Sequence, residues 1–536
     1  MVYIYESIYN LCERVMAPVN RFLGRTSRIA IMVVAMLGCF EYLLYSSLGY
    51  DYAGMMAWTV VLLLICAMML MEDAKDSLTS KEAAAHLQHS LGFQLYLLCS
   101  IVWIIMDVIL PKETYGVGWV NLLIAFLGYV LTRTQNQKMI LYALRISMGL
   151  ASVICVIRCI FVHSSPLYYE GNSGSYRYMG FLSHWNQHAM LTVTLLSISF
   201  SLVVLFINRN MLGYLVSLAL SSALCFLTNA AGTRSSQAYI LVCWTLILFY
   251  VLYRSKTLPK RILHLLLLLV VVPLAWYGTW AGVNHFQYED GDQLKLVEEG
   301  MLPSYDVLAN EVSAHSPSAH HMEEAVTSSL EPATTSSLEP ATTSPMESAA
   351  VTEVTEARGE NAGEVSDNGS EAGAEEESKI PSWLPDRIAK LLYDEQGNID
   401  WNRFFTNRIE IWKAYTGAFN WIGHPAYGYE LWGEIYPAHN LWIGMIYRYG
   451  WIGGILFVLT SVILLVKNLW KGRRIAPDLL MITLAYWSMS IMDTMEERVF
   501  WQFLWIMYYL VTMVTISKVG SKEEVGDEHQ TSSGNP

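Results

Sequence analysis

Long apolar segments recur along this chain and restrict its fold more than any other feature. A helix of roughly 18 apolar residues is long enough to cross a hydrocarbon core of roughly 30 Å. Of 536 residues, 54% are hydrophobic and only 15% are charged, which is too apolar for a soluble protein of this length. We predict an all-α polytopic membrane protein with about twelve spans, at residues 29–49, 53–72, 92–111, 115–132, 139–162, 188–207, 211–229, 236–253, 262–281, 439–467, 478–495 and 499–517.

The cations of the short connections indicate the orientation of these spans. One set of alternate connections is rich in cations, namely Arg14, Arg21, Arg25, Arg28, Arg133, Lys138 and the runs at 254–261 and 467–474. The other set is nearly bare of them. The positive-inside rule then makes residues 1–28 and 518–536 cytoplasmic and turns the long connection at 282–438 outward. No cleavable signal peptide is predicted, because no small-residue cleavage site follows the first span at a convincing place.

The eight cysteines lie almost all inside predicted spans, and none lies in the long outer connection. A disulfide framework is therefore not indicated. No Cys/His spacing is typical of a metal site either. We expect no metal, no cofactor and no nucleic-acid partner.

The outer connection has two unlike halves. Residues 282–380 are rich in Glu, Ser, Thr, Ala, Pro and Gly, and they contain "SSLEPATT" twice, at 328–335 and 336–343. Such a segment cannot bury enough apolar surface to offset its ordering entropy, so we predict that it is disordered. It also carries much of the net charge of −13. Two interpretations stay open, a spacer that keeps polyanions away and a tolerated insertion in a surface loop.

Residues 381–438 are predicted to be structured and to lie on the outer membrane surface. Apolar residues at helical spacing favour an amphipathic helix over 401–419, with one face formed by Phe404, Phe405, Ile409, Trp412 and Ala418. The following stretch, 421–436, is dense in Trp and Tyr. These side chains have an apolar body and a polar tip, which suits a membrane interface.

A titratable residue stands at the start of the next apolar helix. In "PAHNLWIGMIYRYGWIGG" (437–454), His439 and Asn440 come first, and Gly450 and Gly453 follow. An ionisable side chain at that depth in a membrane protein points to function.

Three separated blocks resemble the superfamily of O-antigen ligases and O-antigen, capsule and exopolysaccharide polymerases, which are bacterial membrane glycosyltransferases. The first is "YRYMGFLSHWNQHA" at 176–189, and the second is "LTNAAGTRSSQA" at 227–238. The third runs from "NRIEIWKAY" through "GHPAYGY" to the string around His439. The matching positions are Arg177, Gly180, Asn186, Ala189, Arg234, Arg408, Pro425, Gly428, His439, Gly450 and Gly453.

The resemblance implies a fold of the GT-C type in the bacterial cell membrane, with an extracytoplasmic active site. Members of the superfamily transfer a glycan from undecaprenyl diphosphate to a sugar, lipid or protein acceptor at the outer leaflet, without a metal. His439 would be the general base, because an imidazole titrates near neutral pH. Arg234 and Arg408 would bind the donor diphosphate, since a guanidinium binds phosphate oxygens bidentately. Arg177 would be a third cation.

Each of these residues also has a structural interpretation. The three arginines would otherwise anchor loops at the headgroup level. Asn440 either orients the imidazole or an acceptor hydroxyl, or it caps the helix that follows. Asn186 is a supporting residue of the first block. Gly450 and Gly453 are better explained by close helix packing or a helix break than by ligand contact.

Some polar residues near the predicted site have no assigned role. Arg145 and Arg158, inside the fifth span, either line the path of the lipid phosphate, or extend to the interface, or pair with an acid such as Asp107. Arg448 stands where we expect an acidic or neutral residue in relatives. Five outer acids, predicted to be solvated or to hold acceptor sugars, are Glu430, Glu434, Asp493, Glu496 and Glu497. Asp493 is also expected to tilt or break its span.

The expected activity is polymerisation of lipid-linked oligosaccharide repeat units. The alternative within the superfamily is ligase-type transfer of a finished glycan to a lipid or a protein. An exporter or flippase of lipid-linked sugars is an alternative of another class. It would scatter cations along several spans, whereas here they concentrate at outer positions beside one histidine, which favours transfer over transport.

Overall fold

The computed structural model divides the chain into two units, one of residues 1–305 and 405–536 and the other of residues 306–404. All but one of the described residues belong to the first unit. The structure describes residues 2–46, 52–71, 87, 90–110, 116–162, 167–170, 175–182, 185–207, 209–255, 257–287, 399, 408–426, 428–431, 434–472, 479–492 and 499–517. Residues 288–380 of the predicted disordered segment, most of the start of the predicted outer domain and the C-terminal tail therefore lie outside the described residues. The predicted disorder is wrong for residues 282–287, which continue an apolar helix that ends at Gln287.

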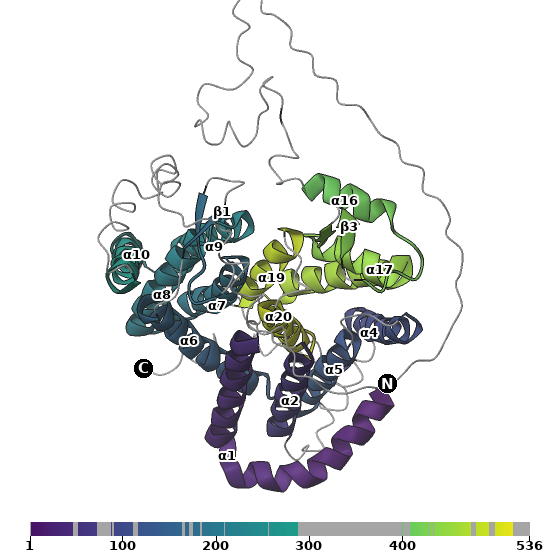
Figure 1. The fold of residues 1–536 in the computed structure, drawn as a ribbon. Coiled ribbons are helices and arrows are strands. Elements are labelled where there is room, and N and C mark those ends of the chain that lie inside the picture. Colours follow the sequence, from purple (N-terminus) through teal and green to yellow (C-terminus); the bar gives the residue numbers. More distant parts are fainter. Residues whose placement is uncertain are drawn as a thin grey trace, which may run out of the picture. The chain divides into compact units, whose positions relative to one another are not determined.

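Helices form the described part of the chain almost entirely, and one coincides with each predicted span (Figure 1). They are α1 (Val2–Ser46), α2 (Tyr52–Leu70), α4 (Leu91–Ile109), α5 (Val117–Thr134), α6 (Gln137–Phe161), α7 (Trp185–Phe206), α8 (Met211–Ala230), α9 (Arg234–Arg254), α10 (Leu258–Gln287), α16 (Arg408–Gly417), α17 (Leu441–Lys467), α19 (Leu480–Met492) and α20 (Val499–Ser517). A single π-helical turn, η1 (Asn468–Gly472), continues α17.

Nine helices in the described residues are long and apolar enough to cross a membrane. Three further apolar helices are shorter, at Gly54–Leu70, Leu480–Ile491 and Leu504–Ser517. The chain is thus a helical, multi-pass membrane protein. That these three helices also span the membrane stays a prediction.

The first helix begins far earlier than the first predicted span. α1 starts at Val2, whereas the sequence predicts a span only from residue 29. Gly24 interrupts α1 with a backbone that only glycine adopts readily (φ 69°, ψ 170°). Figure 1 shows the two halves of α1 pointing in different directions. Residues 2–23 are therefore a separate helix that precedes the first span.

The interior of the bundle is built around α7, which packs against α6, α8, α9, α19 and α20. Several of its buried hydroxyl groups are bonded within the helix itself. Thr194 Oγ1 donates to the Met190 carbonyl at 2.7 Å, and Ser201 Oγ donates to the Ser197 carbonyl at 2.8 Å. Such back-bonding lets a helix carry small polar residues where no water reaches them.

A buried amide joins three other helices. Asn121 Oδ1 of α5 accepts a hydrogen bond from Tyr96 of α4 at 2.9 Å and another from Trp505 of α20 at 3.0 Å. Aromatic rings fill the space around it, and Tyr486 of α19 stacks on Tyr508 of α20 with ring centroids 4.0 Å apart. The C-terminal helices are thereby joined to α4 and α5, far from them in the sequence.

The connections contain two β hairpins that the sequence did not predict. β1 (Leu167–Glu170) pairs antiparallel with β2 (Ser175–Tyr178), and β3 (Tyr429–Leu431) pairs antiparallel with β4 (Glu434–Tyr436). Both are short additions to an otherwise all-α fold.

The amphipathic helix predicted over 401–419 is α16, which the structure describes from Arg408 to Gly417. Residues 401–407, with Phe404 and Phe405, lie outside the described residues. The predicted face is wrong in its centre, because Ile411 and Tyr415 are buried whereas Ile409 and Trp412 are only half-buried.

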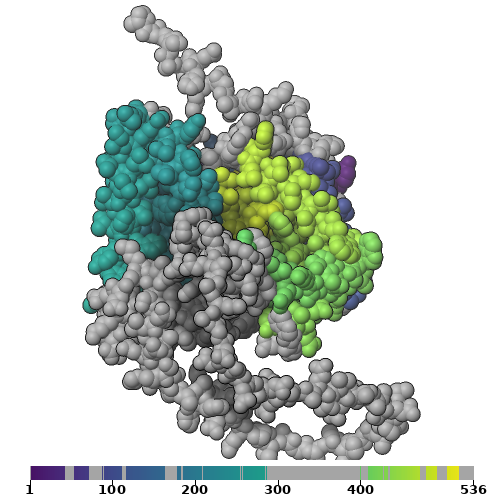
Figure 2. Space-filling view, turned by 90° about the horizontal axis from the view of Figure 1, so that it is seen from above, coloured from purple at the N-terminus to yellow at the C-terminus, as the bar shows by residue number. Residues whose placement is uncertain are grey.

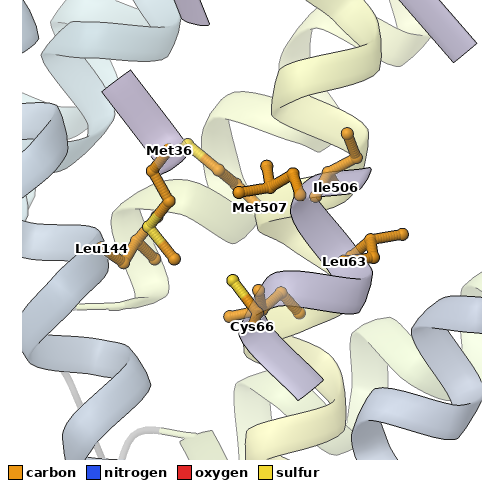
Figure 3. Close-up of a pocket in the computed structure, with 8 residues that line it drawn as sticks. Met36, Leu63, Cys66, Leu144, Ile506 and Met507 are labelled. Carbon is orange, nitrogen blue, oxygen red and sulfur yellow. The ribbon is translucent and has the colours of Figure 1, made fainter. Parts of the chain in front are cut away.

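A small apolar cavity lies within the bundle (Figure 3). Its walls come from α1, α2, α6 and α20, and they include Met36, Leu63, Cys66, Leu144, Ile506 and Met507. No charged side chain lines it. It therefore offers nothing to hold a polar substrate.

Candidate functional site

His439 occupies an unusual backbone position directly before α17. Among the described residues, only Gln135 and His439 adopt a positive φ without being glycine (53° and 47°). Gln135 follows the last residue of α5, where left-handed backbone is common. His439 precedes a helix instead, so that reason does not apply to it. Strained backbone of this kind is often found at functional sites.

Asn440 caps α17 and connects it to α19. Its Oδ1 accepts hydrogen bonds from the Trp442 and Ile443 amides at 3.0 and 3.1 Å, and its Nδ2 donates to the Ile491 carbonyl at 2.9 Å. The helix cap is therefore present in the structure. All these bonds fix the residue that follows His439.

The residue before His439 is fixed as well. Ala438 is buried, and its carbonyl accepts a hydrogen bond from Trp412 Nε1 of α16 at 2.8 Å. Next to it, Tyr415 donates to the Tyr436 carbonyl at 2.6 Å and accepts from the Tyr429 amide at 2.9 Å. Tertiary contacts on both sides thus hold the His439 backbone. We call residues 438–441 the α17 mouth.

The break in α17 receives a loop. Gly450 has backbone angles of 67° and −176°, and a Cβ there would overlap the Trp421 carbonyl. The Trp451 amide donates to the Asn420 carbonyl at 2.9 Å, and the His424 amide donates to the Tyr447 carbonyl at 3.1 Å. The loop at 420–424 therefore inserts at the break and is attached to α17.

Gly453 and Gly454 allow close packing beyond that break. A Cβ on Gly454 would overlap Ile446 within the same helix. The Gly453 carbonyl accepts a hydrogen bond from Trp103 Nε1 of α4 at 3.4 Å. Trp103 stacks on Tyr449 with centroids 4.8 Å apart. These glycines lie at packing contacts in the described structure.

The neighbouring histidine differs from His439. His424 stacks on the Tyr447 ring at 4.1 Å, and its Nε2 lies 2.8 Å from the Ala418 carbonyl and 3.0 Å from Asn420 Nδ2. Its ring is therefore occupied by structural contacts. His439 is half-buried, and its Nδ1 lies in the interior.

The three predicted cations stand at the ends of regular elements. Arg408 is the first residue of α16 and is half-buried, and Arg234 is the first residue of α9. Arg177 lies in β2, which packs against α7 and α8. The side chains of Arg177 and Arg234 lie outside the described atoms. Thr233, Ser235 and Ser236 around Arg234 are buried.

Helix α19 links the three blocks. It packs against α7, α9 and α17, which begin near Asn186, Arg234 and His439. Tyr239 of α9 donates to the Met481 carbonyl at one end of α19 at 3.3 Å, and Asn440 bonds to Ile491 at the other. A helix of this length spans about 20 Å. The two bonds attach α9 and the α17 mouth to opposite ends of α19, and neither bond connects His439 to an arginine. Figure 2 shows α16 and α17 (green) continuous with α19 (yellow) on one face.

A buried histidine in the first block was missed from the sequence. His188 of α7 is fully buried and meets the Tyr178 ring edge-on at a centroid distance of 5.0 Å. Gly180 has a φ of 60°, and a Cβ there would overlap the His188 ring. At Gly180 the backbone that precedes α7 therefore passes directly against the His188 side chain. Asn186 is half-buried in the first turn, and Ala189 is buried.

Arg158 of α6 has a partner that the sequence did not indicate. Its guanidinium lies 2.7 Å from the Glu41 carboxylate of α1 and 5.9 Å from the Phe181 ring. The suggested partner Asp107 is therefore not the one described. Both Arg158 and Glu41 are partly exposed, near the loop of the first block.

Arg448 is another residue that sequence reasoning undervalued. It is almost fully buried in α17, two residues before the break, and its guanidinium lies 5.5 Å from the Tyr449 ring. A charge in such a place is costly unless it is compensated. In the sequence, only its position two residues before Gly450 draws attention to Arg448.

The structure describes the side chain of only one of the five predicted acids. Glu430 is exposed in β3. The side chain of Glu434 lies outside the described atoms, and Asp493, Glu496 and Glu497 lie outside the described residues. Within the described part, no group of three His, Cys, Asp or Glu residues is placed to hold a metal ion.

No family model, curated protein or solved structure matches this chain. The resemblance of the three blocks to membrane glycosyltransferases therefore stays a prediction.

Proposed function

We propose that this chain is a glycosyltransferase of the O-antigen ligase and polymerase type, which polymerises lipid-linked oligosaccharide repeat units. The observation that carries the proposal is His439, held in left-handed backbone at the start of an apolar helix by bonds to both of its neighbours. A position of this kind is costly to maintain and presents one imidazole at a fixed place. It suits a residue that must meet a substrate.

The chemistry assigned to His439 is that of a general base. The acceptor hydroxyl attacks the anomeric carbon of the donor sugar while the imidazole of His439 takes the hydroxyl proton. A new glycosidic C–O bond forms, and the C–O bond to undecaprenyl diphosphate breaks. The bonding electrons leave with the diphosphate. Direct attack of this kind inverts the anomeric centre.

The diphosphate needs positive charge, which two arginines can supply. Arg234 is the first residue of α9, where the partial positive charge of the helix N-terminus also favours phosphate groups. Arg408 begins the described part of α16. We assign the diphosphate to these two arginines, with Arg177 as a third cation.

The proposed setting is the bacterial plasma membrane, with about twelve spans, a fold similar to the GT-C type and the α17 mouth on the extracytoplasmic side. The positive-inside pattern of the short connections supports this orientation. No metal or cofactor takes part in the proposed reaction.

Deletion of the gene in its own cell, followed by analysis of the surface glycan, tests the proposal. Single repeat units left on the carrier are the expected result. Long chains left on the carrier would instead identify a ligase. Donor trapped on the inner leaflet would identify an exporter and contradict glycosyl transfer.

Substitution of the arginines tests the assignment of the diphosphate. Arg234→Lys and Arg408→Lys keep the charge but lose the bidentate fork, so transfer by each purified variant should fall at least about tenfold. The control is Lys413→Arg, a change on an exposed residue of α16. Normal donor binding by both lysine variants would reject the role.

A further inference from the structure

The N-terminal helix carries an exposed apolar stripe that no part of the described protein covers. Six residues recur at helical spacing along residues 2–23, and they are Ile4, Ile8, Leu11, Val15, Val19 and Phe22. Their exposed fractions run from 42% to 90%. At about 100° per residue they fall within about 80° of arc. They form one straight stripe on the helix, which we call the apolar stripe.

A second face of the same helix packs on the bundle. Tyr5 donates to the Leu122 carbonyl of α5 at 2.9 Å, and the Tyr9 ring lies edge-on to Tyr129 at a centroid distance of 6.1 Å. The Arg133 guanidinium, near the end of α5, lies 5.6 Å from the Tyr9 ring. Residues 2–23 are therefore attached to the bundle along a face that is distinct from the apolar stripe.

Contacts to the end of α2 fix the level at which this helix lies. Asn20 Nδ2 donates to the Met68 carbonyl at 2.8 Å, and Arg28 donates to the Met69 carbonyl at 3.2 Å. Asn136, in the connection between α5 and α6, donates to the Leu70 carbonyl at 3.2 Å. Residues 20–28 thus lie at the end of the bundle where α2 and α5 end and α6 begins, whereas Tyr5 reaches Leu122 in the first half of α5.

The third face is polar and basic. Ser7, Asn10, Arg14 and Arg21 are exposed and lie on the other side of the apolar stripe from the face that packs on the bundle. Arg25, just beyond the bend, is exposed too. Over residues 2–28 the chain has four arginines and two glutamates.

We propose that residues 2–23 form an interfacial helix that lies obliquely in the surface of the bilayer and binds anionic phospholipids. One face of the helix packs on the protein, the apolar stripe would contact acyl chains, and the polar face would contact water and headgroups. An interfacial helix requires such an arrangement. The apolar stripe continues the lipid-facing surface of the spans, where Val34 of the second half of α1 is also exposed. Arginines at the edge of the stripe attract anionic headgroups, each by about 1 kcal/mol.

The bend at Gly24 makes this arrangement possible. A straight helix from Val2 to Ser46 would be about 68 Å long, more than twice the thickness of a hydrocarbon core. The bend lets the second half cross the membrane while the first half turns into its surface. Membrane contact at residues 2–23 does not depend on the proposed enzymatic function.

Spin labels on the full-length chain in nanodiscs test this placement. The background is a Cys12→Ser variant, because the other seven cysteines are buried. Labels are attached to Leu11→Cys and Val15→Cys on the stripe and, as matched controls, to Ser7→Cys and Asn10→Cys on the polar face. Stripe labels should collide several-fold more with oxygen than with a water-soluble nickel chelate, and control labels should show the reverse.

Two results would overturn the proposal. Stripe labels as accessible to the nickel chelate as the controls would mean that the stripe faces water or a soluble partner. Dipolar broadening between stripe labels, with neither reagent reaching them, would mean that a second copy of the chain covers the stripe.

Lipid charge is tested by amide exchange of residues 2–23 in the same full-length chain. Exchange should be at least about fivefold slower in phosphatidylglycerol than in phosphatidylcholine nanodiscs. The double variant Arg14→Gln/Arg21→Gln should remove that difference. Equal exchange of the unmodified chain in both lipids would reject the preference for anionic lipid.

Discussion

Helices α1 and α17 break in the same way for different reasons. Each contains one glycine with almost the same backbone, φ 69° and ψ 170° at Gly24 and φ 67° and ψ −176° at Gly450. That region is essentially restricted to glycine. The surroundings, however, have little in common. A Cβ on Gly24 would meet nothing within 4 Å, whereas a Cβ on Gly450 would overlap the Trp421 carbonyl.

The difference shows how one local signal serves two purposes. At Gly450 the protein fills the break with the loop at 420–424, which is thereby attached to α17. At Gly24 no atom of the described residues lies within 4 Å of where a Cβ would stand. There the glycine changes the direction of the chain and leaves the preceding helix free to lie on lipid.

Gly450→Ala should have the largest effect on stability. The change combines about 2 kcal/mol of backbone strain with an overlap against main-chain atoms that cannot move aside, so a loss of about 4 kcal/mol is expected. Thermal unfolding of the purified protein measures it. Gly423→Ala, on the other side of the same contact (φ 81°), should behave alike. A melting temperature within 2 °C or so of the unmodified protein would show that the loop is not held in the break.

Asn440→Ala should have an intermediate effect. It removes the cap of α17 and the bond to Ile491, each of which contributes about 1 kcal/mol. Glycan transfer should fall as well, because His439 loses a fixed neighbour. Asn440→Asp is the matched control, since it keeps the capping oxygen and loses only the donor to α19. If the Ala and Asp variants unfold at the same temperature, the helix cap makes no measurable contribution to stability.

Gly24→Ala should have the smallest effect on stability, about 1 kcal/mol, because the strain can relax where no neighbour stands in the way. Transfer activity should stay close to that of the unmodified protein. Its unfolding is compared directly with that of Gly450→Ala under the same conditions. Equal losses for both variants would erase the contrast between the two breaks.

Much of the fold could be predicted from the sequence because apolar length is a local property. Each predicted span coincides with a helix, within a few residues at most ends. The helix at residues 2–23 was not predicted because it is amphipathic, and a search for continuous apolar runs overlooks a stripe. The face of α16 was misplaced because the burial of Tyr415 depends on partners in β3 and β4.

The candidate site was less accessible to prediction. His439, Asn440 and Gly450 could be selected because their spacing is visible in one string. The bond from Trp412 to Ala438, the pair of Arg158 and Glu41 and the buried His188 join residues that are distant in sequence or face inward. Nothing in the local pattern distinguishes them.

The most direct measurement is the transfer rate of His439→Asn in nanodiscs, with an undecaprenyl-diphosphate-linked repeat unit as both donor and acceptor. Asparagine tolerates left-handed backbone, so this variant removes the base without adding strain, which alanine would do. Transfer should fall by about 10² to 10⁴, as expected for loss of a general base, while the melting temperature stays unchanged. Transfer at the unmodified rate by a stable variant would contradict the catalytic role of His439.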